Sequence, residues 1–122
     1  MKADYGKIYE SPSDFFELKG SVTMQLSPAA AIEVCRMAAA HRLVVARIEG
    51  GIWLNPGFES RLDCIWDGAD PPLDTAAAHA NNLLAIQFIE NKRDVHDVFI
   101  LTAPSVTGWA HRATSSPVSP GQ

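Results

Sequence analysis

The sequence predicts an α+β fold, a mostly antiparallel sheet with two helices on one face in the split β-α-β-β-α-β order. Two observations predict this class. Strand-like and helix-like segments follow one another along the chain, and its 122 residues fit one domain with one core. Hydrophobic residues make up 47% of the chain and charged residues 20%, which is typical of a globular protein and excludes a disordered or membrane-embedded chain.

Two helices are expected. The first spans residues 28–41, because Ser27 can cap its start and the proline that follows fits the first helical position. The second spans residues 73–91. Its apolar side chains recur every three or four residues, with Asn81 and Asn82 on the polar side. This apolar stripe contains Leu73, Ala77, Ala80, Leu84 and Phe88.

Three strands are expected around these helices. The β-branched and apolar runs at residues 43–48 and 98–101 predict two strands, and alternation predicts a third at residues 58–66. Residues 22–26 are a weaker fourth candidate. The glycine-rich link at residues 50–57 predicts a wide hairpin between the two middle strands.

Alternate side chains of the strand at residues 58–66 are expected to point to opposite faces of the sheet. The set facing the helices is Phe58, Leu62, Cys64 and Trp66. The set facing away is Glu59, Arg61, Asp63 and Ile65. The open face of the sheet is therefore expected to carry charge.

The chain is expected to hold an N-terminal extension at residues 1–20, a single α+β domain at residues 21–109 and a flexible tail at residues 110–122, which is polar and proline-rich. No apolar run is long enough for a membrane span, and no secretory signal is found near the start, so a cytoplasmic location is expected. Cys35 and Cys64 lie at apolar positions, which favours two buried free thiols over a disulfide or a zinc site.

Acidic charge is concentrated in the middle of the chain. Residues 43–74 contain six acidic and two basic side chains, a net charge of −4, whereas the rest of the chain contains eight of each and is neutral. Nucleic-acid binding requires clustered lysine and arginine, so no direct nucleic-acid contact is expected. An acidic surface instead attracts a basic protein and speeds its association.

Asp63, Asp67 and Asp70 lie close together in the sequence, and carboxylates bind Mg²⁺ or Ca²⁺. Their spacing does not fit an EF-hand loop, so a charged surface is favoured over a metal site, and no cofactor is expected. The sequence also lacks the GxSxG, HExxH, Walker A and Rossmann patterns, so the chain is not expected to be an enzyme. An enzyme of unrecognised type that uses Asp63 and His96 is a remaining alternative.

Three segments carry a family resemblance: GGIWLNPGFESRLDCIWDGADPP at residues 50–72, the helix with two successive asparagines, and HDVFILTAP at residues 96–104. Together they resemble the immunity proteins of bacterial contact-dependent growth inhibition systems, a kind of polymorphic toxin system, over about residues 26–109. The resemblance implies a protein that binds and blocks the toxic C-terminal domain of a cognate toxin, often a nuclease acting on tRNA or DNA. These proteins share a role and no catalytic motif, so the resemblance transfers no functional residue.

The predicted function is that of an immunity protein that neutralises a basic toxin, an RNase or a DNase, through its acidic surface. Acidic side chains would steer the toxin, and Trp53 on the hairpin would be an exposed apolar anchor. The predicted toxin-binding residues are Glu49, Trp53, Glu59, Asp63, Asp67, Asp70 and Asp74. The free chain is expected to be a monomer or a weak homodimer. The alternative is a small-molecule-binding or oligomerising α+β module without catalytic activity.

Overall fold

The structure is a computed structural model that describes residues 4, 6–54 and 57–108. Its elements are α1 (Pro12–Glu17), α2 (Pro28–Ala38), the 3₁₀ turn η1 (Ala39–His41), β1 (Arg47–Trp53), β2 (Phe58–Asp67), α3 (Thr75–Lys92) and β3 (Val98–Thr102). The tail predicted at residues 110–122 lies outside the described residues.

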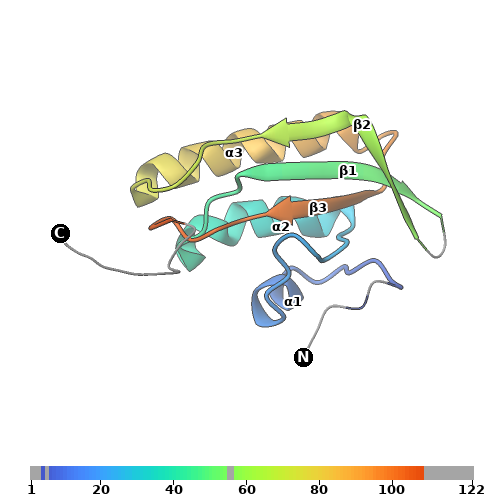
Figure 1. The fold of residues 1–122 in the computed structure, drawn as a ribbon, viewed down its shortest axis with the longest axis horizontal. Helices are drawn as coiled ribbons and strands as arrows, with labels where there is room; N and C mark the ends of the chain where they lie inside the picture. Colours follow the sequence, from blue (N-terminus) through green and yellow to red (C-terminus); the bar gives the residue numbers. More distant parts are fainter. Residues whose placement is uncertain (1–3, 5, 55–56, 109–122) are drawn as a thin grey trace.

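β1 is the central strand of the sheet. The three strands form one antiparallel sheet in the order β2-β1-β3, so β1 pairs with β2 on one side and with β3 on the other. Both α2 and α3 lie against the same face of this sheet (Figure 1). This arrangement confirms the predicted α+β class, with an antiparallel sheet and two helices on one face.

Residues 22–26 do not form the fourth strand that the alternation predicted. Val22 has a φ of 65°, a left-handed conformation that interrupts an extended chain. Leu26 makes isolated bridges to Tyr9 and to Phe99 of β3, and the N–H of Val22 donates to the carbonyl of Leu101 at 2.8 Å. This segment covers the outer edge of β3. Among the described residues no strand pairs with the outer edge of β2, which is therefore the open edge of the sheet.

The strand predicted at residues 43–48 begins instead at Arg47 and continues to Trp53. Two successive glycines are typical of a strand end, yet Gly50 and Gly51 lie inside β1. A Cβ atom on Gly50 would meet the sulfur of Cys64 and lie 2.8 Å from the ring of Phe99. Glycine is needed here because β1 is packed closely by side chains from both neighbouring strands.

The buried face of α3 differs from the predicted apolar stripe. Asn81 and Asn82 are 8% and 1% exposed, whereas Leu84 is 55% exposed. The asparagines point inward because they bind backbone groups: Asn82 Oδ1 accepts from the N–H of Val45 at 2.8 Å, and Asn81 Oδ1 accepts from that of Ala69 at 2.8 Å. The buried residues of α3 are Ala78, Asn81, Asn82, Ala85, Ile86 and Ile89.

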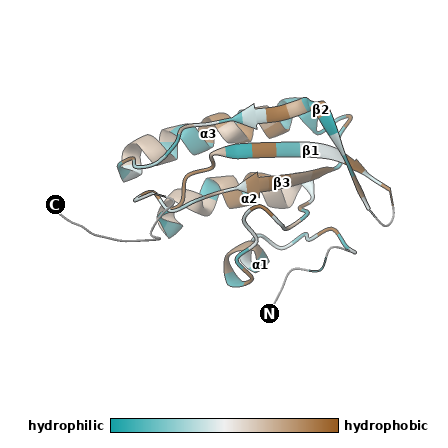
Figure 2. Ribbon diagram, in the orientation of Figure 1, coloured by the Kyte–Doolittle hydropathy of each residue, from teal (hydrophilic) through white to brown (hydrophobic). Residues whose placement is uncertain are grey.

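The core lies between the sheet and the two longer helices, and the N-terminal residues Tyr9 and Phe15 also belong to it. Figure 2 shows β1 changing between hydrophilic and hydrophobic along its length, as expected for a strand with one buried face. Cys35 and Cys64 are free and buried, which confirms the prediction for both thiols. Within the described part of the chain, no helix is long and apolar enough to cross a membrane.

Candidate functional site

β2 leaves the regular ladder where it passes the middle of β1. Glu49 pairs with Ile65 and Gly51 pairs with Ser60, so residues 61–64 stand opposite Gly50 alone. The extra residues arch out of the sheet. We call this segment, Arg61, Leu62, Asp63 and Cys64, the β2 bulge. Bulges bend an edge strand and are over-represented beside functional sites.

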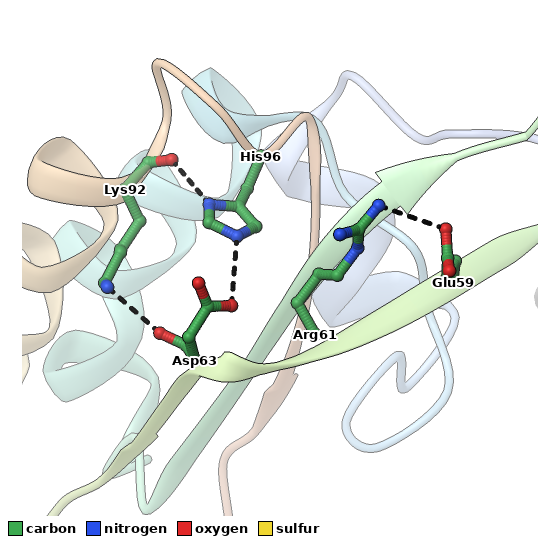
Figure 3. Close-up of polar contacts among 5 residues, drawn as sticks. All are labelled: Glu59, Arg61, Asp63, Lys92 and His96. Carbon is green, nitrogen blue, oxygen red and sulfur yellow. Dashed lines mark hydrogen bonds and ion pairs between the residues drawn. The ribbon is translucent and has the colours of Figure 1, made fainter.

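The β2 bulge is attached to the C-terminal end of α3. Lys92 Nζ donates to the carbonyl oxygen of Asp63 at 3.0 Å, and His96 Nε2 lies 3.6 Å from Asp63 Oδ1 (Figure 3). His96 is 5% exposed, and its Nδ1 lies 3.0 Å from the Lys92 carbonyl oxygen. The structure therefore brings together Asp63 and His96, the two residues of the enzyme alternative.

The thiol nearest to this pair in the sequence is not suited to act as a nucleophile. The neighbouring Cys64 is fully buried, and desolvation by burial raises the pKa of its thiol. A thiol with a raised pKa stays protonated near neutral pH and is a poor nucleophile. The described residues also contain no group of three or more side chains that could hold a metal ion. The contacts of Asp63 and His96 are those of a structural attachment.

Leu62 is the largest departure from the predicted alternation. It was expected to face the helices together with Cys64 and Trp66, but it is 91% exposed, because the arch carries it out of the sheet. Cys64 and Trp66 keep the predicted phase, since Cys64 is fully buried and Trp66 packs against the core. The prediction for Leu62 was wrong because it assumed an unbroken ladder.

A second acidic group surrounds Arg47 on the open face of the sheet. The guanidinium donates to Glu49 Oε2 at 3.0 Å within β1 and to Asp67 Oδ1 at 2.6 Å across to β2. These hydrogen bonds, the one to Glu49 first, raise the pKa of Arg47, which therefore stays charged. Glu49 and Asp67 thus share one positive charge, and their net contribution to the surface is reduced.

Asp70 and Asp74 lie in the loop that leads from β2 to α3. Asp74 caps the helix, because its Oδ1 accepts from the N–H of Ala77 at 2.7 Å. Asp70 is exposed, and its side chain makes no hydrogen bond or ion pair with another described residue. Of these two carboxylates, only that of Asp70 has no hydrogen-bond or ion-pair partner in the described structure.

Trp53 and Glu59 lie at the opposite end of β2, near the hairpin. Trp53, the predicted apolar anchor, pairs with Phe58 and is partly buried. The backbone N–H of Trp53 donates to Asp97 Oδ1 at 2.7 Å. Glu59 Oε1 accepts from Arg61 at 3.2 Å (Figure 3). The hairpin end therefore carries mixed charge beside a half-buried aromatic side chain.

Taken together, the predicted residues follow β2 from the hairpin to the loop before α3, with Glu49 and Trp53 beside them on β1. They form a strip along the open edge and do not converge on one point. Sequence reasoning missed Leu62. Its exposure follows from the register: Arg47 pairs with Asp67 and Trp53 pairs with Phe58, so ten residues of β2 stand opposite seven of β1 and a bulge is required. The strand ends that reveal this mismatch were not predictable to the residue.

An α+β scaffold with an irregular, charged and exposed sheet edge leaves that edge accessible for contact with another protein. Comparisons with known proteins define the class. Residues 24–103 match the family model of the colicin-E5 Imm protein. This match covers more than half of the chain, so the chain belongs to the colicin-E5 immunity protein family.

Individual relatives agree with this assignment. The chain is 59% identical over 109 residues to the immunity protein CdiI of Burkholderia pseudomallei, which covers 89% of this chain and 100% of that protein. It is 41% identical over 80 residues to the colicin-E5 immunity protein of Escherichia coli, which covers 65% of this chain and 96% of the relative. The resemblance to immunity proteins of contact-dependent growth inhibition systems is thereby confirmed.

Proposed function

We propose that this immunity protein neutralises a basic nuclease toxin by covering it with the open edge of its sheet, and that it acts in the cytoplasm without catalysis of its own. The proposed contact residues are those predicted from the sequence: Glu49, Trp53, Glu59, Asp63, Asp67, Asp70 and Asp74. The observation that carries the proposal is that these residues lie on β2 or directly beside it. Among the described residues, no strand pairs with the outer edge of β2.

Charge supports a basic partner. The stretch of residues 43–74 holds the whole net charge of −4. Long-range attraction between opposite charges raises the association rate, whereas the lifetime of a complex depends on a few buried contacts. A nuclease presents a basic surface to its own substrate, so an acidic strip is complementary to the part of the toxin that must be blocked.

The absence of catalysis is supported by the surroundings of Asp63 and His96. Their near neighbour Cys64 is buried, and its thiol has a raised pKa. The two residues attach β2 to α3, which is a sufficient explanation for their contact. In the alternative function, a small-molecule or oligomerising module, the ligand would occupy a cavity of about 290 Å³ that includes Phe15, Phe16 and His41 in its walls.

The test uses the double variant Asp67→Lys/Asp70→Lys and the isolated cognate toxin domain. We expect association to slow about tenfold at low ionic strength, and the difference from the parent to shrink as salt is added. The matched control is Glu17→Lys/Glu90→Lys, which makes the same change in net charge at exposed positions of α1 and α3.

The two double variants separate a local effect from a general one. If both slow association equally, only the total charge matters, and the strip along β2 is not the contact surface. If Asp67→Lys/Asp70→Lys binds and protects cells like the parent, the proposal is wrong. Size-exclusion chromatography at several concentrations tests the oligomerising alternative, because a homodimer through the β2 edge would compete with the toxin.

A further inference from the structure

We infer that Leu62, at the top of the β2 bulge, is the apolar anchor of this surface and that it inserts into an apolar socket with a basic rim on the toxin. The inference rests on the proposed function and deepens it, because it names the contact that holds the complex together after charge has steered the two proteins into place. It also replaces Trp53 as the expected anchor.

The exposure of Leu62 is the first step. At 91% it exceeds that of every other exposed large hydrophobic residue in the described part of the chain, of which Val95 at 69% and Leu54 at 58% come next. Burying a leucine side chain is favourable by about 1.5–3 kcal/mol. Because the free protein leaves this leucine in water, this free energy of burial can be gained when a partner covers the side chain.

The second step is that Leu62 is held in place. The residue after it, Asp63, receives a hydrogen bond from Lys92 on its carbonyl oxygen at 3.0 Å and lies 3.6 Å from His96. The next residue, Cys64, is fully buried and packs over Gly50. The leucine thus projects from a segment attached at a helix end and in the core. A backbone segment that is already held in place loses less entropy on binding.

Charge around Leu62 identifies the occupant. Leu62 is flanked in the chain by Arg61 and Asp63, and Arg61 is paired with Glu59 at 3.2 Å (Figure 3). Asp63 in turn lies beside Lys92, whose Nζ donates to its carbonyl oxygen at 3.0 Å, so these four charges balance. The negative charge of the surface comes from the wider stretch of residues 43–74, which has a net charge of −4. An apolar centre with a polar rim is the usual anatomy of a contact surface. The complementary site is an apolar socket bordered by lysine or arginine.

Protection of the sheet edge does not account for Leu62. A bulge with charged side chains discourages edge-to-edge pairing of two copies, and Arg61 and Asp63 fit that role. An exposed leucine is not among the features that protect an edge in this way. Recognition of a partner accounts for all three side chains, whereas edge protection accounts for two.

The test compares Leu62→Ala, Leu62→Met and the control Leu84→Ala, which truncates an exposed leucine on the outer side of α3. Binding to the isolated cognate toxin domain is measured by surface plasmon resonance. We expect Leu62→Ala to raise Kd roughly 10- to 100-fold, mainly through faster dissociation. Leu62→Met and Leu84→Ala should stay within about threefold of the parent.

Thermal unfolding supplies the second readout. A leucine that is 91% exposed contributes little to folding, so the Tm of Leu62→Ala should stay within about 2 °C of the parent. If the parent binds the toxin domain and Leu62→Ala binds equally well, the inference is overturned and the proposed function stands. If the parent does not bind the toxin domain, the proposed function fails, and the inference fails with it.

Discussion

Asn82 binds Val45 in the manner of a neighbouring strand. Its Oδ1 accepts from the N–H of Val45 at 2.8 Å, and its Nδ2 donates to the carbonyl of Leu43 at 3.2 Å. A single side chain amide therefore satisfies backbone groups of the buried segment that leads into β1. Asn81 adds a bond from its Nδ2 to the carbonyl of Val45 at 2.8 Å.

Removing this amide should destabilise the domain strongly. Asn82→Ala leaves the N–H of Val45 and the carbonyl of Leu43 without their partner in a site where Asn82 is 1% exposed. We expect a loss of about 2–3 kcal/mol in the free energy of unfolding, measured with urea. The control Asn91→Ala, at an exposed position of the same helix, should cost under about 0.5 kcal/mol. Equal losses in the two variants would contradict this role.

Asp74 allows its capping role to be separated from its charge. Asp74→Asn keeps an oxygen that can accept from the N–H of Ala77, so stability should change by less than about 0.5 kcal/mol, whereas Asp74→Ala should cost about 1 kcal/mol. If Asp74 also steers the toxin, both variants should slow association at low salt to the same degree. If only Asp74→Ala slows association, the start of α3 affects toxin binding through its cap and the charge of Asp74 does not.

Gly50 should not accept even one methyl group. In Gly50→Ala the added Cβ would meet Cys64 and lie 2.8 Å from the ring of Phe99, so we expect a loss of about 1–3 kcal/mol in urea unfolding. The double variant Gly50→Ala/Cys64→Ala removes the sulfur from that contact. The double variant should lose less free energy of unfolding than the two single variants lose in sum. Strictly additive losses would show that the added Cβ and the sulfur of Cys64 do not crowd each other.

Stability should fall in alkaline solution because of Cys35. Burial raises the pKa of this thiol from 9.0 to about 12. Its folded-state pKa lies above its unfolded-state value, so its contribution is complete below pH 9 and is lost as pH rises from about 9 towards 12. The slope approaches about 1.4 kcal/mol per pH unit.

The variant Cys35→Ala should therefore show a flatter decline than the parent in urea titrations at pH 9, 10 and 11 under reducing conditions. Some decline should remain, because burial also raises the pKa of the Cys64 thiol. Parallel curves for parent and variant would exclude Cys35 as the source of the alkaline decline.

The sequence was sufficient for the fold class and for most elements, because these depend on local signals. The start of α2 follows from Ser27, whose Oγ accepts from the N–H of Ala30 at 3.2 Å. The phase of Cys64 and Trp66 follows from simple alternation. The buried face of α3 was mistaken, because Asn81 and Asn82 are polar and the partners that allow their burial are far away in sequence.

The candidate site was predictable in its charge and not in its shape. The acidic composition of residues 43–74 is visible in the sequence, and the placement of these acids along an open edge follows from the strand order. The pairing of Arg47 with Asp67 and the exposure of Leu62 depend on the register between β1 and β2. Register is set by contacts across the sheet, which no local pattern encodes.

The β2 bulge has a consequence for how such proteins diverge. Arg61, Leu62 and Asp63 are exposed, whereas the adjoining Cys64 is fully buried. Asp63 also contacts His96, but substitutions at Arg61 and Leu62 should alter folding little. If the proposed contact surface is correct, natural selection can change these two positions for a new partner while the scaffold stays constant. Related chains that share this core are expected to vary most in identity at these positions, with each variant suited to a different opponent.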